Sequence, residues 1–185
     1  MRPQDGKDKI LTAALNLFAQ NGFHATSVSQ IAKAAKVSKG LTYNYFDSKE
    51  ALLLAIIERA SETMMAVAGE MATGGGYQIM LRDFLDRYGK SLKANNQFLT
   101  FQLSLMFQPD LKTIVAGPMH ARAAQLLAIT EAMFSEAGAA APLIVARRFV
   151  SELDGITLHY LSVFKNYPLD EMLVHLYQNY KELPR

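Results

Sequence analysis

Residues 27–52 constrain the fold of this chain most strongly, because they contain two short helices separated by a tight turn. Ser27 is followed three residues later by Gln30, which is the spacing of a capping box at the start of a helix. Ser38 is a second residue of the type that caps a helix. Two short helices joined by a turn of a few residues, with a longer helix after them, are typical of a helix-turn-helix unit.

The second helix of this unit, expected over residues 39–46, has an exposed face that an ordinary solvated helix lacks. It carries Lys39, Tyr43, Asn44 and Tyr45. Lysine and tyrosine can donate hydrogen bonds to phosphates, and asparagine can bond to the edge of an adenine in the major groove. The face therefore indicates DNA binding, although a small helical corner with a partly buried pair of tyrosines would explain the same residues.

Residues 10–57 resemble the DNA-binding domain of the TetR family of bacterial transcriptional regulators. The resemblance rests on residues at helix starts, turns and buried positions: Ala14, Leu17, Phe18, Gly22, Phe23, Thr26, Ser27, Val28, Ile31, Ala32, Ala35, Val37, Ser38, Gly40, Tyr43, Tyr45, Phe46, Ser48, Lys49, Glu50 and Leu52. It covers about a quarter of the chain. Thr42 departs from the family, which usually has a larger apolar residue packed inward there, and Asn44 is also less common in it.

The resemblance implies an all-α protein of two domains. Residues 1–48 are expected to form a three-helix DNA-binding domain of the helix-turn-helix class, and residues 49–185 a C-terminal helical bundle for ligand binding and dimerisation. The implied function is a ligand-responsive regulator of transcription. It would act as a repressor that leaves its DNA operator when a small lipophilic or aromatic effector binds, with activation of transcription as the alternative.

The DNA contacts that the resemblance implies lie in the helix-turn-helix unit and at the start of the next helix. They are Thr26, Ser27, Ser38, Lys39, Gly40, Leu41, Tyr43, Asn44, Tyr45 and Lys49. Asn44 is expected to bond to adenine, and Leu41 to contact a thymine methyl group. Thr26 and Ser27 lie where free backbone N–H groups favour a phosphate, although Ser27 can also serve only as a cap. Lys49 is either a phosphate contact or an ordinary solvated lysine.

The remaining sequence predicts helices throughout, nine or ten in total, and no strand pattern of useful length. The boundaries, taken from caps, glycines and prolines, are Asp5 or Asp8 to Gly22; Lys49, capped by Asp47 or Ser48, to about Met71; 77–92; 97–107; a short segment around Ile114 between Pro109 and Pro118; 120–136; 143–164; and Pro168 to about Tyr180. The glycines at 74–76 are the clearest linker in the chain.

Two of the late helices are expected to form a dimer. The helix over residues 143–164 is apolar around much of its circumference. Contact along a single side would leave part of that apolar surface exposed to water, so the helix needs packing partners on more than one side. In the family, two C-terminal helices pair with their copies as a four-helix bundle. The interface residues so implied are Phe149, Leu153, Ile156, Tyr160, Met172, Leu173 and Leu176. A homodimer suits a palindromic operator, whereas a helix buried inside a monomer is the alternative.

The bundle is rich in methionine and phenylalanine, and such soft side chains suit a pocket for varied apolar ligands. Together with polar groups at mostly apolar positions, the candidate pocket residues are Met64, Phe84, Tyr88, Phe98, Phe101, Gln102, Met106, Met119, Glu152 and His159. For each of them, ordinary core packing or a satisfied surface position is the alternative. The pocket itself is implied by the resemblance.

The amino-acid composition excludes several other classes of protein. The chain has no cysteine, which excludes disulfides and thiolate metal sites, and half of its residues are apolar, which excludes a disordered chain. It shows no apolar signal segment and no long uncharged apolar stretch, so we expect a cytoplasmic protein without membrane contact.

An enzyme is not expected. The sequence contains no nucleophile elbow, no phosphate-binding glycine loop and no paired histidines of the metalloprotease type. Its four histidines, His24, His120, His159 and His175, are scattered along the chain. We therefore expect no cofactor, no metal and no catalytic residue. A helical scaffold that binds other proteins is the remaining class.

Overall fold

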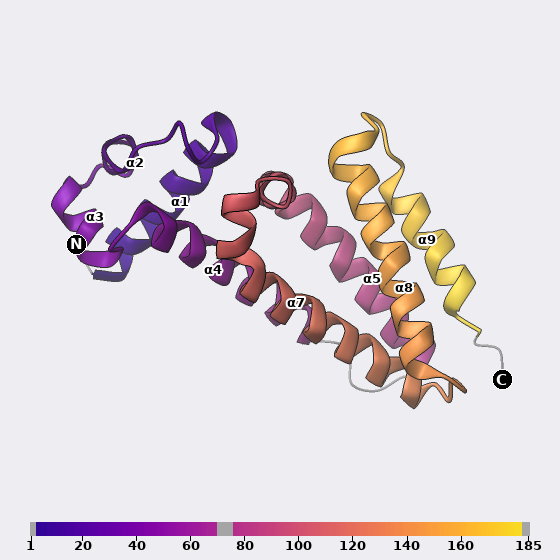
Figure 1. Ribbon diagram of the computed structural model, residues 1–185. Coiled ribbons are helices and arrows are strands. Elements are labelled where there is room, and N and C mark those ends of the chain that lie inside the picture. The colour runs from indigo at the N-terminus through magenta and orange to yellow at the C-terminus, as the bar shows by residue number, and fades with distance from the viewer. Residues whose placement is uncertain (1–2, 70–75, 183–185) are drawn as a thin grey trace. The chain divides into compact units, whose positions relative to one another are not determined.

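The computed structural model describes residues 3–69 and 76–182, and side chains over residues 5–62 and 76–182. These residues form nine α-helices and one short π-helical turn, with no strand among them (Figure 1). The expected all-α fold is confirmed. Packing divides the chain into an N-terminal unit, Met1–Ser61 with Gln97–Pro118, and a C-terminal unit, Glu62–Asn96 with Met119–Arg185. This division by packing does not test the expected functional boundary at residue 48.

The N-terminal unit is built around the helix-turn-helix. Its helices are α1 (Pro3–Asn21), α2 (Val28–Ala34), α3 (Lys39–Tyr45), the first part of α4 (Lys49–Gly69), α6 (Asn96–Leu105) and the first part of α7 (Pro109–Glu136). Helix α1 packs against both α2 and α3. Apolar side chains from α1, α2, α4, α6 and α7 fill the core: Ile10, Phe18, Ile31, Leu53, Ile57, Leu105, Leu111 and Val115. The rings of Phe18 and Phe101 stack with centroids 6.0 Å apart, which ties α6 to α1.

Helix α1 ends as the glycine signal predicts. Gly22 has a positive φ of 81°, and its N–H donates to the carbonyl of Phe18 at 2.9 Å. The ring of Phe23 then folds back onto Phe18, with centroids 5.1 Å apart. Glycine reaches this left-handed conformation without the steric cost that a Cβ would bring, so the chain can turn directly into the loop before α2.

Helix α2 ends in a Schellman motif that forms the turn of the helix-turn-helix. The N–H of Val37 donates to the carbonyl of Ala32 at 3.0 Å, and that of Lys36 to the carbonyl of Lys33 at 3.1 Å. Lys36 has a φ of 57° and occupies the position where this motif usually has glycine. The turn is therefore fixed by backbone hydrogen bonds, with a lysine in a left-handed conformation.

Helix α7 corrects one expectation. The sequence predicts a short segment around Ile114 and a separate helix from residue 120, but α7 runs unbroken through Pro118. Proline has no N–H to donate to the carbonyl four residues earlier and usually ends or kinks a helix. Here Leu111 and Val115 are buried before the proline and Phe134 after it, so packing on both sides holds the helix across it. The boundary between the two units falls at this proline.

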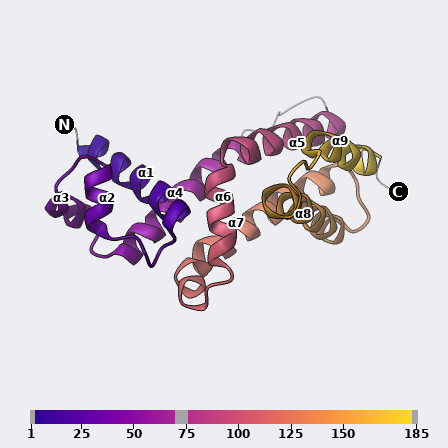
Figure 2. The ribbon, with the colours of Figure 1, turned by 90° about the horizontal axis from the view of Figure 1, so that it is seen from above.

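The C-terminal unit contains α5 (Tyr77–Ala94), the second part of α7, α8 (Pro142–Leu158), the π-helical turn η1 (His159–Val163) and α9 (Leu169–Tyr180). Helices α8 and α9 lie side by side, and α5 packs against α9 (Figures 1 and 2). A Cβ added to Gly89 would lie 2.7 Å from Cδ1 of Leu173, so glycine allows α5 this close to α9. The ring of Phe149 lies 5.3 Å from that of Phe134 and 5.0 Å from that of Tyr180.

Several helix boundaries differ from the expected ones at the ends, where fraying and capping decide them. Helix α8 was expected to reach residue 164, but it ends at Leu158 and continues as η1. Helix α4 is described as far as Gly69, so the expected end at Met71 lies outside the described residues, as do Gly74 and Gly75. Gly76 stands at the N-cap of α5 with a φ of 81°. Within the described ranges, no helix is long and apolar enough to cross a membrane.

Candidate nucleic-acid interface

The start of α2 is held by the capping box that the sequence predicts. Oγ of Ser27 accepts a hydrogen bond from the N–H of Gln30 at 3.3 Å, and Oε1 of Gln30 accepts one from the N–H of Ser27 at 2.7 Å. Thr26 is almost completely buried, and its hydroxyl lies 2.8 Å from the carbonyl of Gly22 and 3.2 Å from that of Leu17. Both side chains therefore serve the protein's own turn, and their role as DNA contacts stays a prediction.

Helix α3 is fixed from both ends. Oγ of Ser38 accepts from the N–H of Leu41 at 3.0 Å at the N-cap, and the buried ring of Phe46 stands at the C-cap. Thr42 is 1% exposed, so the smaller residue still occupies the inward position of the family pattern. Its hydroxyl is 3.4 Å from the carbonyl of Ser38. With Thr42 turned inward, the opposite face of the helix is left to solvent.

That solvent face gathers the polar residues expected to meet DNA. Lys39, Gly40 and Asn44 are exposed, and Tyr43 is 44% exposed. The ammonium group of Lys39 lies 5.8 Å from the centroid of the Tyr43 ring. The second tyrosine, Tyr45, is only half-buried and lies against the ring of Phe46, and Leu41 is half-buried as well. The helix thus presents a cation, a phenol and an amide together.

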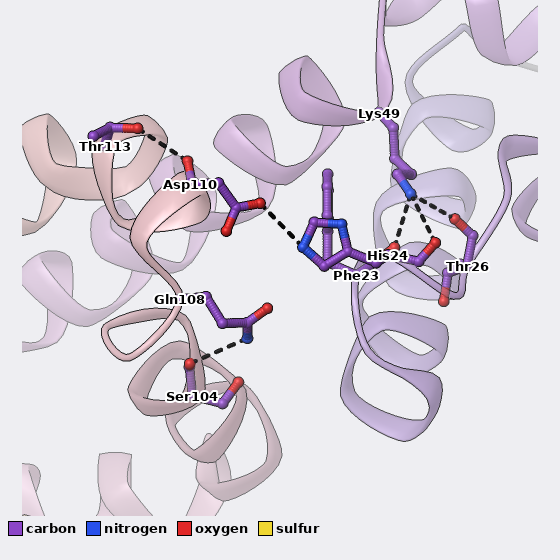
Figure 3. A network of polar contacts seen from close by, with 8 residues as sticks. All are labelled: Phe23, His24, Thr26, Lys49, Ser104, Gln108, Asp110 and Thr113. Atoms are coloured by element: carbon purple, nitrogen blue, oxygen red, sulfur yellow. Dashed lines mark hydrogen bonds and ion pairs between the residues drawn. The ribbon is translucent and has the colours of Figure 1, made fainter.

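The side chain of Lys49 is directed to the protein's own backbone, and its role as a phosphate contact stays a prediction. Its ammonium group donates to the carbonyls of Phe23 at 2.9 Å, Thr26 at 3.0 Å and His24 at 3.4 Å, and it lies 4.4 Å from the centroid of the Phe23 ring (Figure 3). A phosphate contact would have to replace these hydrogen bonds. Sequence reasoning missed the arrangement because backbone carbonyls leave no signature in the residue types that carry them.

A second contact on the same turn also went unnoticed in the sequence. Nε2 of His24 lies 3.1 Å from Oδ2 of Asp110, in the first turn of α7 (Figure 3). The hydroxyl of Thr113 donates to the carbonyl of Asp110 at 2.9 Å. Both members of the ion pair are exposed, so the pair contributes little stability, on the order of 0–1 kcal/mol. Partners this far apart in sequence can be found only from the fold.

The candidate ligand residues are divided between the two units. Phe98, Phe101 and Gln102 are buried in the N-terminal unit, where Met106 is exposed. In the C-terminal unit lie Phe84, Tyr88, Met119, Glu152 and His159, as does Met64, whose side chain is outside the described residues. That these residues line one pocket stays a prediction.

Several of these candidates have partners inside the protein. Oε1 of Glu152 accepts from the Tyr180 hydroxyl at 2.8 Å. The ring of His159 packs edge-on against the rings of Phe164 and Tyr167. The rings of Phe84 and Phe149 lie 5.8 Å apart in the aromatic core. Phe84 therefore packs in the core, whereas Glu152 and His159 are half-buried side chains with partners inside the protein.

A polar cluster lies around Tyr88 in the C-terminal unit. Its hydroxyl is 2.6 Å from Oγ1 of Thr157, and burial raises the pKa of Tyr88 to about 12. Burial also lowers the pKa of Arg122 and raises the pKa of Asp154, while the attraction between these two charges opposes both shifts. Charged groups held in such a bundle can orient a polar end of a mainly apolar ligand.

Most of the expected dimer residues face the interior of the protomer. Five of them are buried in the isolated chain: Phe149, Leu153, Ile156, Leu173 and Leu176. Tyr160 and Met172 are half-buried. The same two helices leave other apolar side chains exposed, namely Leu143, Ile144, Leu158 and Val174. A dimer through α8 and α9 remains a prediction, and these outward residues are the ones open to a second copy.

Known proteins resemble the N-terminal part of the chain in sequence. Residues 10–56 match the family of bacterial regulatory proteins described as the tetR family. The HTH-type transcriptional regulator YuxN of Bacillus subtilis is 37% identical over 95 residues, which are 51% of this chain and 33% of that protein. UidR of Escherichia coli K12 is 43% identical over 63 residues, 34% of this chain and 32% of UidR. The matched segments thus span about a third of these relatives' lengths.

Solved structures extend the likeness to the whole fold. Salmonella enterica GusR superposes with a TM-score of 0.73 and 25% identity, covering 97% of this chain and 95% of GusR. The relatives matched in sequence are transcriptional regulators and not enzymes. Residues 10–56, which form the helix-turn-helix of this chain, are thus similar to the tetR family of bacterial regulatory proteins.

Proposed function

We propose that this protein is a cytoplasmic repressor of transcription that binds a palindromic DNA operator as a homodimer and leaves it when a small lipophilic or aromatic effector binds. The observation that carries the proposal is the solvent face of α3, where Lys39, Tyr43 and Asn44 stand together on a helix capped at both ends. Such a face matches the donors and amide needed for a duplex, and a core or scaffold helix has no need of it.

The residues of this face take different roles. Asn44 reads adenine through its amide, and Leu41 contacts a thymine methyl group. Lys39 and Tyr43 donate to backbone phosphates, whereas the more buried Tyr45 mainly supports the helix. Ser38 fixes the start of the helix, and Gly40, which has no side chain to obstruct the groove, permits close approach.

Dimerisation supplies the second reading helix. The exposed apolar side chains of α8 and α9, Ile144 and Val174 above all, are the surface that a second copy would cover. Two-fold pairing would present two α3 helices to successive half-sites about one turn of DNA apart.

The effector is proposed to bind in the C-terminal bundle, which contains the polar cluster of Tyr88, Arg122 and Asp154. A coupling of about 1–3 kcal/mol per site would be typical of such regulation. By thermodynamic reciprocity, the operator must then weaken effector binding by the same factor that the effector weakens operator binding.

The proposal is tested by selecting DNA duplexes from a random library with the purified protein. The affinity for the most enriched duplex is then measured by titration with the protein, followed by fluorescence anisotropy. Tyr43→Ala and Lys39→Ala are each expected to weaken binding roughly tenfold, because each removes a DNA contact. Circular dichroism should show both variants folded, since both side chains face solvent.

Lys112→Ala, which removes an exposed lysine from α7, serves as the matched control and should keep wild-type affinity. Wild-type affinity in the Tyr43 and Lys39 variants would discard the assignment of α3 as the reading helix.

A further inference from the structure

We infer that Lys49 is a positioning residue for DNA recognition and not a phosphate contact. Its ammonium group holds the turn between α1 and α2, and through that turn it sets the place of α2 and of the reading helix α3. The inference rests on the proposed function, because it concerns how well α3 fits a duplex. It adds a residue that acts on DNA through the protein's own backbone.

The geometry around Lys49 directs its donors to the protein's own backbone. A lysine ammonium group has three N–H donors. Three carbonyl oxygens, those of Phe23, Thr26 and His24, lie 2.9, 3.0 and 3.4 Å from Nζ. The Phe23 ring covers the group from another side, with its centroid 4.4 Å away. A phosphate could bind only after at least one of these hydrogen bonds had broken.

The location of Lys49 in its helix supports the same role. Lys49 is the first residue of α4, and a positive charge at a helix N-terminus is disfavoured by the helix dipole. The partial negative charges of three convergent carbonyls compensate for this placement. A solvated lysine would gain nothing at this position, whereas a lysine surrounded by carbonyls is stabilised there.

The turn that Lys49 holds leads directly into the DNA-binding helices. Thr26 is fixed in the same turn by its own hydroxyl, 2.8 Å from the carbonyl of Gly22. The next residue, Ser27, caps α2, and α2 packs against α3. Loss of the Lys49 hydrogen bonds would free the carbonyls of this turn and so loosen the placement of α2 and α3.

The test compares Lys49→Met with Lys39→Met, since methionine keeps an unbranched apolar stem and removes only the charged donor. Each variant is titrated with the selected duplex and with a scrambled duplex, over a series of KCl concentrations. Non-specific binding depends on phosphate contacts, and specific binding also depends on the fit of the reading helix. The two substitutions should therefore change the affinities for the selected and the scrambled duplex differently.

For Lys49→Met we expect roughly a tenfold loss on the selected duplex, little change on the scrambled duplex and an unchanged salt slope. For Lys39→Met we expect losses on both duplexes and a slope smaller by about 0.9, the value for one phosphate contact. A residue needed only for stability would leave the ratio of the two affinities unchanged once the folded fraction is counted.

A second measurement uses the wild-type protein and so does not depend on how the variants fold. With ¹⁵N-lysine labelling, the Lys49 ammonium protons should exchange slowly in the free protein and show no scalar coupling to ³¹P in the DNA complex. Such a coupling, or a loss of one unit of salt slope in Lys49→Met, overturns the inference while the proposed function stands. A wild-type protein that selects no duplex contradicts the proposed function and the inference together.

Discussion

At the scale of single residues, Lys36 stands out because it holds a left-handed conformation that glycine usually provides. Its φ of 57° closes the Schellman motif between α2 and α3. A residue with a Cβ loses about 1–2 kcal/mol there relative to a right-handed conformation. The chain therefore keeps a lysine at a measurable cost in stability, at the turn that connects the two helices of the DNA-binding motif.

Lys36→Gly should raise the free energy of unfolding by roughly 0.5–1 kcal/mol. Relief of the left-handed strain exceeds the extra entropy that glycine gives the unfolded chain. Urea denaturation measures the change. Lys33→Gly is the matched control: within helix α2 the same substitution should destabilise by up to about 1 kcal/mol. A Lys36 variant that is no more stable than wild type would contradict the strain argument.

Tyr88 should make the free energy of unfolding fall as the pH rises in the alkaline range. Burial raises the pKa of Tyr88 from its ordinary value of 10.0 to about 12, so the folded state holds this proton more tightly than the unfolded chain. The stabilisation is complete below about pH 10 and is lost as the pH rises toward 12. Tyr88→Phe should flatten the fall of the unfolding midpoint between these pH values, as followed by thermal melts. An equally steep fall in the variant would assign the effect to other groups.

Residue-scale features were predictable where they are local. Ser27, Ser38 and Gly22 were identified because caps depend on residues a few positions away. The carbonyl contacts of Lys49 and the pairing of His24 with Asp110 were not, because both join segments that only the fold brings together.

At the scale of helices, α7 shows where local rules stop. Its two prolines were interpreted as boundaries, and Pro109 does begin the helix, but Pro118 lies inside it. A proline marks a helix end only if packing on both sides does not hold the helix together. Periodicity predicted where most helices lie, because the spacing of apolar residues is a local property. The buried side chains that stabilise α7 on either side of Pro118 belong to two separate cores, which the sequence alone does not reveal.

Pro118→Ala should stabilise the protein by up to about 3 kcal/mol, since it restores a backbone donor and removes a steric clash within a helix. Thermal unfolding measures the gain, and hydrogen exchange should show greater protection near residue 118. Pro142→Ala is the control: this proline lies at the start of α8, where its missing N–H has no helical partner, so little change is expected. Unchanged stability in the Pro118 variant would contradict the expectation that this proline costs the helix stability.

At the scale of the whole molecule, the open question from the sequence was which apolar residues face the core and which face a partner. Periodicity identified α8 and α9 as unusually apolar but could not separate these two destinations. The structure places Phe149 and Leu153 in the protomer core and leaves Ile144 and Val174 exposed. A hydrophobic helix buried on two sides gives the same sequence pattern for both sides.

Val174→Asp should shift the proposed dimer toward monomers, because a charge in a covered apolar surface is left without a partner. The expected change is at least about tenfold in the dimer dissociation constant, measured by sedimentation velocity. Ile79→Asp is the control: its side chain is similarly exposed, at 52% against 58%, but lies on α5. A Val174 variant that dimerises like wild type would place the contact elsewhere.

One residue that completes the C-terminal core, Tyr180, lies at the C-terminal end of α9. The ring of Tyr180 packs on Phe134 and Phe149, its hydroxyl binds Glu152, and its carbonyl accepts from the Tyr77 hydroxyl at 2.6 Å. During synthesis, therefore, the N-terminal unit has all its helices once residue 118 has emerged, while the other unit must wait for residue 180. At common translation rates that interval is roughly 3–12 s, during which the unfinished bundle would offer its aromatic interior to chaperones.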